Sequence, residues 1–429
     1  MTPISACRSC SSTSLVNVLD LGSLPLANGL LRGKDLDRTE DRFPLTLLFC
    51  GSCALVQIRE TVSPSRLFRD YCYQSSFSET MLAHARQASN SYIERFGLTT
   101  DSFVVEIASN DGYLLKNFVD RNIPVLGIDP AENIAPVARS RGVPTLVAFF
   151  DLDVARRLAA SGPRADLILA SNVLAHVADL DGMVAGIAEL LTDDGVAVVE
   201  FPYVGDMLDR VEFDTIYHEH LCYFSAHAVE SLLSRHGLRL ADVEHLGIHG
   251  GSLRATIRRR VPGHPASGAV ERLLAEERHT GRLTVQHHLD FAGRVAIRQA
   301  EITGELARRR AAGQKLAAYG ASAKGSTLMN SCGLGAETLE YVVDRSPVKQ
   351  GLFTPGNHLP ILSPEVLSER QPDGVLLLTW NFAEEILAQQ HDYLSAGGEF
   401  IIPGSPPTIA RASGREPVPT PPGRHRRQQ

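Results

Sequence analysis

Short apolar runs alternate with helical patterns through the middle of the chain. Between about residues 100 and 200 the apolar runs are FVVEIAS, VLGID, ADLILASNV and GVAVVEFP, and helix-like stretches such as DGMVAGIAELL separate them. Runs of this kind are typical of buried parallel strands that are joined by crossover helices. The pattern therefore predicts an α/β domain built on a parallel sheet.

The same pattern returns in the C-terminal third of the chain. KLAAYGA, TLEYVVD, GVLLLTW and EFIIP read as buried strands with helices between them. A long charged stretch rich in Ala and Leu, from about 265 to 312, has the helical period and separates the two sets. We therefore predict a second α/β domain after a helical connector.

The first 70 residues have a different character, because they are rich in turns and carry two Cys-x-x-Cys elements. The run FPLTLLFC between these elements suggests short strands around a metal site. Four thiolates at this spacing close a tetrahedral zinc site and leave no open position for catalysis. We predict a structural zinc ion, and its ligands are Cys7, Cys10, Cys50 and Cys53.

Composition excludes several classes of protein. The 429 residues are 44% hydrophobic and 21% charged, so the chain is neither disordered nor fibrous. A formal net charge of -7 gives no support to a surface that binds duplex nucleic acid. No apolar run approaches the roughly 18 residues that a membrane span needs, and the start lacks a signal-peptide pattern. We therefore expect a cytoplasmic protein without a membrane partner.

The segment VVEIASNDGYLL has the form of a strand, a tight polar turn and a helix. Glu106 ends the strand, and Gly112 stands where the backbone would approach a ligand. Asp129 ends the next strand and could accept hydrogen bonds from a ribose diol. Ala108 and Asn110 replace two glycines of the common Gly-x-Gly-x-Gly loop. The segment predicts a pocket for an adenosine ligand, and a plain strand-to-helix turn is the alternative.

Further residues could line this pocket. VAFFD could place Phe149 or Phe150 against an adenine, and SNVLAHV puts Asn172 and His176 at the carboxyl end of a strand. Each of these residues alone is more typical of a core, so they carry weight only as a set.

Two clusters concern a reacting group. DYCYQSS contains Tyr71 and Tyr73, and IYHEHLCYFS contains Glu219 and His220. The second cluster lacks the third ligand and the His-Glu-x-x-His spacing of zinc hydrolases. Acid–base chemistry fits better, because histidine titrates near neutral pH. A polar cluster between domains is the alternative.

A second nucleotide-type pocket is predicted in the C-terminal third. In YGASAKGSTLMN, a helix N-terminus with Ser322, Lys324 and Thr327 could face a diphosphate. Asp344 and Lys349 follow and could hold a ribose and a phosphate. HGGSLR is another segment in which the backbone could approach a ligand closely. For YGASAKGST, the alternative is a Gly-rich turn with a purely structural role.

Taken in order, these motifs resemble the sugar C-methyltransferases of deoxysugar biosynthesis over roughly residues 5 to 405. The resemblance rests on the double Cys-x-x-Cys, Tyr-x-Tyr-x-Ser-Ser, EIASNDG, SNVLAHV, Glu-His, HGGSLR, YGASAKGSTL and WNFAEEI. It implies an α/β fold with a zinc-binding N-terminal module at 1–70, a class I methyltransferase-type Rossmann-like domain at 71–245, a Rossmann-like sugar-nucleotide-binding domain at 246–405 and a disordered tail at 406–429.

The resemblance also implies the chemistry. The cofactor would be S-adenosyl-L-methionine, beside the structural Zn2+. The substrate would be a nucleotide-linked, dTDP-type 4-keto-(2,6-di)deoxy sugar that is methylated at C3, with C5 left open. A base would form an enolate next to the ketone, and its carbon would attack the methyl group. We expect a monomer or weak oligomer that has no nucleic-acid partner.

The family's roles fall on particular residues of this sequence. The resemblance implies His220 as the base, Glu219 as its neighbour and Tyr71 as the stabiliser of the oxyanion. The expected cofactor contacts are Glu106, Asp111, Gly112, Asp129 and Phe150. The expected substrate contacts are Tyr73, Asn172, His176, His249, Ser252, Ser322, Lys324, Asp344 and Lys349. Tyr217 and His218 receive no role.

Three other functions compete with this one. An N- or O-methyltransferase acting on a nucleotide-linked sugar would keep the cofactor pocket. A dinucleotide-dependent sugar oxidoreductase would explain YGASAKGSTL, but Gly-x-Gly-x-x-Gly is absent. An RNA-binding or RNA-methylating zinc protein would explain the Cys pairs, but the net charge of -7 opposes it.

Overall fold

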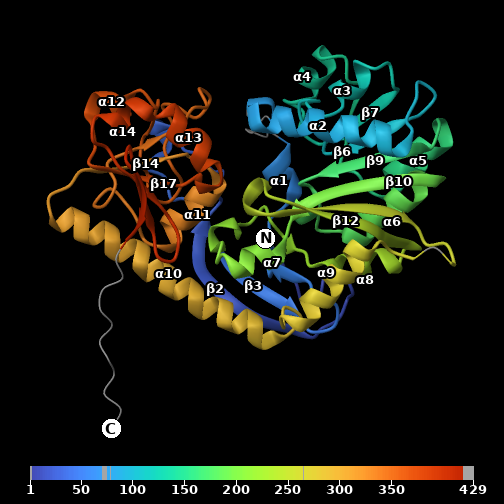
Figure 1. Cartoon of the computed structure of the whole chain (residues 1–429), viewed down its shortest axis with the longest axis horizontal. Coiled ribbons are helices and arrows are strands. Elements are labelled where there is room, and N and C mark those ends of the chain that lie inside the picture. The colour runs from blue at the N-terminus through green and yellow to red at the C-terminus, as the bar shows by residue number, and fades with distance from the viewer. Residues whose placement is uncertain (1, 70–74, 78, 264, 419–429) are drawn as a thin grey trace, which may run out of the picture. The chain divides into compact units, whose positions relative to one another are not determined.

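The computed structural model describes residues 2–69, 75–77, 79–263 and 265–418 (Figure 1). The chain forms two compact units. Unit 1 comprises Met1–Val18, Thr46–Met207 and His218–His288, and unit 2 comprises Leu19–Leu45, Leu208–Tyr217 and Leu289–Gln429. The chain therefore crosses between the units several times.

A seven-stranded sheet forms the centre of unit 1, in the order β12-β13-β10-β9-β6-β7-β8. The five strands from β10 to β8 are parallel, and β13 runs antiparallel to both of its neighbours. This order confirms the predicted methyltransferase-type sheet. Its strands are β6 (Val104–Ile107), β7 (Val125–Asp129), β8 (Thr145–Val147), β9 (Ala165–Ser171), β10 (Leu191–Pro202), β12 (Leu238–Leu246) and β13 (Ser252–Arg259).

Alternating side chains bury both faces of the central strands. Leu167 and Leu169 of β9 join one core with Phe118 and Tyr92, while Ile168 on the opposite face is also fully buried. The strands β9 and β10 lie side by side (Figure 1). The helices of this unit are α1 (Pro64–Phe68), α2 (Glu79–Phe96), α3 (Lys116–Val119), α4 (Ala135–Ser140), α5 (Leu152–Ser161), α6 (Leu180–Leu190), α7 (Val204–Asp209), α8 (Ala226–Ser234) and α9 (Gly268–His279).

Because the parallel strands end at one edge, the polar residues that follow them gather there. This edge carries the predicted cofactor loop after β6 and the predicted SNVLAHV segment after β9. The sheet therefore places the two motifs on neighbouring strands.

A four-stranded sheet, in the order β11-β4-β3-β2, contains the predicted FPLTLLFC strand as β3. Its strand β11 follows His220 directly in the chain and pairs with β4. The small sheet therefore supports the segment that carries the predicted base. Its strands are β2 (Leu15–Pro25), β3 (Arg42–Cys50), β4 (Val56–Ile58) and β11 (Cys222–Tyr223), and a separate pair joins β1 (Thr2–Pro3) to β5 (Glu60–Thr61).

Unit 2 contains the second α/β sheet, in the order β16-β15-β14-β17-β18-β19-β20, and this confirms the predicted second domain. Its first five strands are parallel. Its elements are α10 (Val285–Ala311), β14 (Leu316–Tyr319), α11 (Ala323–Ser331), β15 (Val342–Val343), β16 (Ile361–Leu362), α12 (Val366–Arg370), β17 (Gly374–Leu377), α13 (Ala383–Gln389), α14 (His391–Ser395), β18 (Phe400–Ile402), β19 (Thr408–Arg411) and β20 (Gly414–Pro417).

The strands β19 and β20 correct one prediction. They lie inside the tail, 406–429, that was predicted to be disordered. Ile409 and Ala410 are buried because β19 extends the sheet beside β18, so two apolar residues outweigh the Pro-rich composition around them. Residues 419–429 lie outside the described residues.

The helices α9 and α10 confirm the predicted helical stretch between the two α/β sheets. Among the residues that the structure describes, no helix is both long enough and apolar enough to cross a membrane. The cytoplasmic location stays a prediction.

Candidate active site

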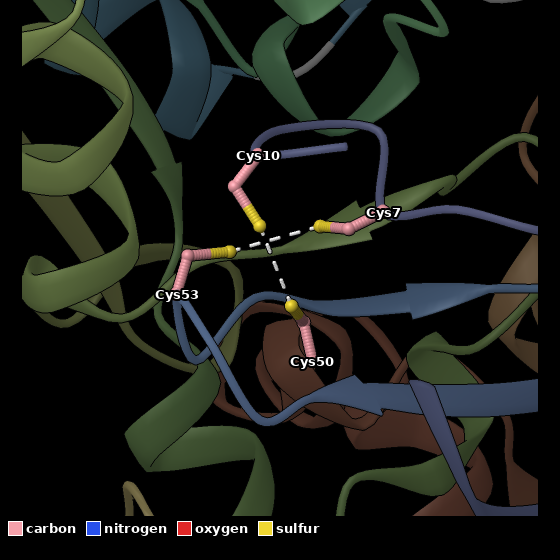
Figure 2. Close-up of side chains that lie close together, drawn as sticks. All are labelled: Cys7, Cys10, Cys50 and Cys53. Carbon is pink, nitrogen blue, oxygen red and sulfur yellow. Dashed lines mark hydrogen bonds between the residues drawn. The ribbon is translucent and has the colours of Figure 1, made fainter. Parts of the chain in front are cut away.

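Four cysteines converge at one end of β3 (Figure 2). The Sγ atoms of Cys7 and Cys53 are 3.7 Å apart, and those of Cys10 and Cys50 are 3.6 Å apart. A tetrahedral zinc ion with Zn–S bonds near 2.3 Å would have sulfur–sulfur edges of about 3.8 Å. The four thiols therefore fit a closed zinc site, as their spacing predicted.

Hydrogen-bond donors surround the thiol of Cys7. A hydrogen bond from Cys53 is the largest influence on Cys7, and together with backbone N–H groups and the Gln57 amide it lowers the pKa of Cys7 to about 4. Zinc binds the thiolate form. These donors favour the thiolate form at Cys7, whereas burial raises the pKa of Cys50 and the hydrogen bond with Cys7 raises the pKa of Cys53.

The loop after β6 adopts the backbone conformation of a glycine-rich loop although two glycines are replaced. The φ angles are 56° at Ala108, 48° at Asn110 and 77° at Gly112, all in the left-handed region. A Cβ atom on Gly112 would lie 3.0 Å from a methyl carbon of Val143. Asn tolerates this region well, whereas Ala is strained there. The departures from the glycine pattern therefore leave the shape of the loop intact.

Two carboxyl groups stand beside this loop in different environments. Asp129 accepts hydrogen bonds from the N–H groups of Asn110 and Ala131, each at 2.8 Å. Glu106 is fully buried, and neither carboxyl oxygen has a hydrogen-bond partner among the described residues. Burial raises the pKa of Glu106 well above its usual range. An unsatisfied buried carboxyl group next to a left-handed loop fits a ligand that carries amino or hydroxyl donors, as S-adenosylmethionine does.

One carboxylate oxygen of Asp111 is engaged within the protein, and its predicted contact with the cofactor stays a prediction. Its carboxylate forms an ion pair with Arg141 at 2.9 Å and accepts a hydrogen bond from the Ser76 N–H at 3.3 Å. The Ser75 N–H donates to the Asn110 side chain at 3.0 Å. The end of the predicted DYCYQSS cluster is thus tied to the cofactor loop.

Two predicted aromatic residues of this cluster, Tyr71 and Tyr73, lie outside the described residues. Their predicted roles as oxyanion stabiliser and substrate contact stay predictions. The backbone contacts of Ser75 and Ser76 show only that the end of their segment reaches the cofactor loop.

The two phenylalanines after β8 occupy different environments. Phe150 is half-buried, and a Cβ atom on Gly186 of α6 would lie 2.9 Å from its ring. Phe149 is 41% exposed. Phe150 thus packs on a helix, and Phe149 has more surface to offer an adenine.

The predicted acid–base residues come together beside the carboxyl end of β9. The Nδ1 atom of His176 lies 2.8 Å from the backbone oxygen of Glu219. The imidazole rings of His176 and His220 meet edge to face, with centroids 4.9 Å apart. The pairing unites residues 43 positions apart in the sequence, so the two motifs lie in contact, and their common role at one site stays a prediction.

Backbone contacts fix the position of His220, which is 8% exposed. The Leu221 N–H donates to the Ala175 carbonyl at 2.7 Å, and the Ile58 N–H donates to the Leu221 carbonyl at 3.0 Å. His220 is therefore held between β4 and the turn that carries His176.

Burial lowers the pKa of His176 to about 4, so this ring is neutral at pH 7. A carbonyl oxygen can only accept, so Nδ1 carries the proton and donates to Glu219, which leaves Nε2 as an acceptor. His176 is thus a fixed, uncharged neighbour of His220.

Because the folded pKa of His176 lies below its unfolded value of 6.5, the unfolded chain binds more protons as the solution is acidified. The contribution of His176 to stability is complete above pH 6.5 and is lost as pH falls from 6.5 towards 4. We expect His176→Gln to flatten the fall in free energy of unfolding across this range. Urea unfolding at several pH values measures the slope, and an unchanged slope would contradict the assignment.

A buried ion network next to this site was not predicted from the sequence. Glu200, at the carboxyl end of β10, accepts from His84 at 2.9 Å, Tyr92 at 3.1 Å and Arg254 at 2.6 Å. Burial alone would raise the pKa of Glu200, but His84 and Arg254 outweigh it and lower this pKa to about 2. The Asn172 N–H also donates to the Glu200 carbonyl at 2.8 Å. The network ties β13 and α2 to the strand end beside Asn172.

We expect Arg254→Met to destabilise the protein by about 3–5 kcal/mol, because it leaves Glu200 buried without its arginine partner. The matched control is Arg260→Met. Arg260 pairs with Glu230 at 2.7 Å but is 52% exposed, so its loss should cost no more than about 1 kcal/mol. Chemical unfolding measures both, and equal losses would contradict the network's importance.

The basic motif HGGSLR is therefore structural at two of its positions. Arg254 neutralises Glu200, and Ser252 is fully buried with its hydroxyl donating to the Ile248 carbonyl at 3.2 Å. This geometry gives no support to the prediction that Ser252 contacts the substrate. The His249 side chain lies outside the described residues.

In unit 2, three predicted substrate contacts hold the turn after β14. Ser322 begins α11 and accepts from the Gly325 N–H at 3.1 Å. Asp344 accepts from the Ala321 and Ser346 N–H groups at 2.8 Å each, and Lys349 donates to the Ala321 carbonyl at 2.8 Å. Asp344 thus resembles Asp129 of unit 1, because each carboxylate accepts hydrogen bonds from two backbone N–H groups.

Lys324 lies among charged and aromatic side chains of unit 2. Its Nζ atom is 4.6 Å from the centre of the Trp380 ring, and the carboxylates of Asp214 and Glu212 oppose the desolvation that lowers its pKa. Part of its charge is thus already balanced within the protein.

Comparisons with known proteins agree with this geometry. Family models match at residues 7–68 for a zinc binding domain, at 81–243 for a methyltransferase domain and at 247–404 for a C-methyltransferase C-terminal domain. The C-methyltransferase NovU of Streptomyces niveus is 38% identical over 411 residues, which cover 96% of this chain and 98% of that protein.

Two of the solved structures that match this chain are methyltransferases of low sequence identity to it. The mitomycin 7-O-methyltransferase MmcR is 19% identical over 43% of this chain and 56% of its own, with a TM-score of 0.34. Magnesium protoporphyrin IX methyltransferase from Synechocystis is 15% identical over 42% of this chain and 83% of its own, with a TM-score of 0.33. The relative that matches nearly the whole chain shows the family. The chain belongs to the C-methyltransferase family as an S-adenosylmethionine-dependent enzyme with a zinc-binding domain.

Proposed function

We propose that the enzyme transfers a methyl group to C3 of a dTDP-linked 4-keto-(2,6-di)deoxy sugar. The observation that carries the proposal is the convergence of His176, Glu219 and His220 beside the sheet edge that holds the cofactor loop. Carbon methylation next to a ketone needs a base, and a histidine titrates in the right range for it.

In this mechanism S-adenosylmethionine supplies an electrophilic methyl group. His220 takes the proton from the carbon beside the ketone, and the electron pair left behind forms the enolate of the sugar. S-adenosylmethionine, held by Glu106 and the loop after β6, would supply the methyl group that the enolate carbon accepts, and the sulfur would keep the electron pair of the broken bond. Neutral His176 holds the Glu219 backbone, so it keeps the base in place without adding positive charge that would raise the energy of a protonated His220.

The other roles belong to the same proposal. Tyr71 would donate a hydrogen bond to the developing oxyanion, Tyr73 and Asn172 would line the sugar site, and Glu106 would accept from the cofactor. His249, Ser322, Lys324, Asp344 and Lys349 would face the sugar nucleotide directly or through the turn that they hold. The domain limits at 70/71 and 245/246 are proposed with these roles.

The enolisation step can be tested separately from methyl transfer. The wild-type enzyme is incubated in deuterated water with S-adenosylhomocysteine and a dTDP-linked 4-keto-2,6-dideoxyhexose, and the sugar is examined by proton NMR. We expect deuterium to replace the C3 hydrogen. Methyl transfer to the same sugar by an enzyme that never exchanges this hydrogen would contradict base-catalysed enolisation, and it would favour transfer to oxygen or nitrogen.

A further inference from the structure

The chain enters the candidate catalytic segment from a stretch that belongs to the other unit. Residues 208–217, here named the strap, are part of unit 2, and His218 opens the next segment of unit 1. Glu219 and His220 follow directly. The strap is therefore the stretch of chain that leads into the proposed base.

The backbone of the strap is strained and clamped. Val211 has a φ angle of 56°, a conformation that is unfavourable for a β-branched residue. Arg298 of α10, which is 3% exposed, donates to the carbonyls of Arg210 at 2.7 Å and Val211 at 2.6 Å. Arg294, one turn away, donates to the Leu208 carbonyl at 2.9 Å. Two arginines thus hold a conformation that the strap would not keep alone.

The side chains of the strap are clamped as well. The indole N–H of Trp380 donates to the Asp214 carboxylate at 2.6 Å, and Asp214 is fully buried. Lys324 of α11 lies over the Trp380 ring, and its charge interacts with Asp214 and Glu212. Helix α11 packs on the short helix η4 (Phe213–Thr215) that contains Asp214. Helix α10, helix α11 and Trp380 therefore hold the ten residues of the strap, which lie far from them in the sequence.

We propose that the strap is a positioning device for the catalytic pair, and that Trp380 and Asp214 are positioning residues for His220. They touch no reacting atom. They fix the backbone from which Glu219 and His220 extend, so the C-terminal domain contributes to the rate of proton removal and not only to substrate binding. This inference rests on the proposed function, in which His220 is the base.

The variants Trp380→Phe and Asp214→Leu remove the same hydrogen bond, because phenylalanine has no N–H donor and leucine has no acceptor. Because small displacements of a catalytic group are costly, we expect each to lower kcat about 10- to 100-fold. Deuterium exchange at the substrate carbon should fall by the same factor, while the Kd for S-adenosylmethionine stays unchanged. The double variant should be no slower than the slower single variant, because both act on one contact.

Tyr393→Phe is the matched control. The Tyr393 hydroxyl donates to the Pro372 carbonyl at 2.8 Å in the same unit, and this variant also removes one donor from a buried aromatic residue. We expect wild-type kcat from it, with thermal melting measured for every variant. Wild-type kcat and exchange in both strap variants, or an equal loss of kcat in Tyr393→Phe, would overturn the proposal.

A measurement that does not depend on catalysis distinguishes the role of the strap from the proposed function. Trp380 is the chain's only tryptophan, so fluorescence emission reports on the strap directly. Asp214→Leu should shift the emission spectrum, and an unchanged spectrum would contradict the hydrogen bond between Trp380 and Asp214. The wild-type enzyme could fail both to methylate a keto sugar and to exchange its hydrogen, while the variant still shows this spectral shift. That result would contradict the proposed function but not the contacts that hold the strap.

Discussion

Replacement of His220 by alanine is expected to lower methyl transfer about 100- to 10,000-fold, which is the usual contribution of a positioned general base. The ring stands edge to face with His176, and the next residue, Leu221, is held by backbone hydrogen bonds to Ala175 and Ile58. Alanine leaves these backbone contacts in place. The loss should therefore appear in kcat, and also in the deuterium exchange of the substrate.

The cofactor site should survive this change, because the loop after β6 and Glu106 do not depend on the His220 ring. Calorimetric titration should give a wild-type Kd for S-adenosylmethionine. His236→Ala is the control, since His236 pairs with Asp181 at 2.8 Å in the same unit and has no proposed role in catalysis. Wild-type turnover in His220→Ala, or a loss explained by weaker cofactor binding, would remove His220 from the role of base.

Cys50→Ser is expected to have the second large effect, the loss of zinc and of the fold of the N-terminal module. Cys50 is fully buried at the end of β3, and its Sγ lies 3.6 Å from that of Cys10. Structural zinc sites contribute on the order of 10 kcal/mol to small domains, so three remaining ligands should hold the metal far more weakly. Metal analysis should show one zinc per wild-type chain and much less in the variant.

The loss should extend beyond the metal, because the zinc-bound sheet includes β4, which pairs with the strand that follows His220. Thermal unfolding should begin at a lower temperature, and methyl transfer should fall with it. Cys332→Ser is the control, since Cys332 caps α11 outside the four-cysteine group. Full zinc content in Cys50→Ser would contradict the assignment of the ligands.

The features that sequence predicts well here are those encoded by local spacing. Two Cys-x-x-Cys pairs identify all four zinc ligands because each pair needs only a tight turn to face the metal. Apolar runs locate the strands of both sheets because parallel strands are buried on both faces. The histidine motifs could be joined into one site because the ends of parallel strands share an edge.

The features that sequence misses depend on partners far apart in the chain. Glu200 meets His84 across 116 positions, and no local pattern marks either residue as a partner of the other. Asp344 and Lys349 appear as ligand contacts from their types, whereas the structure shows their donors and acceptors engaged with the turn after β14. Charged residues beside a loop can bind a ligand or brace the loop, and residue type alone does not distinguish these uses.

The most direct test of the central claim uses S-adenosylmethionine labelled with carbon-13 in its methyl group, a dTDP-linked 4-keto-2,6-dideoxyhexose and the purified full-length enzyme. Mass spectrometry and carbon NMR then locate the label. The account predicts one added methyl group bonded to C3 of the sugar. A label found on oxygen or nitrogen, or no transfer to this sugar by an enzyme that binds S-adenosylmethionine and zinc, would contradict it.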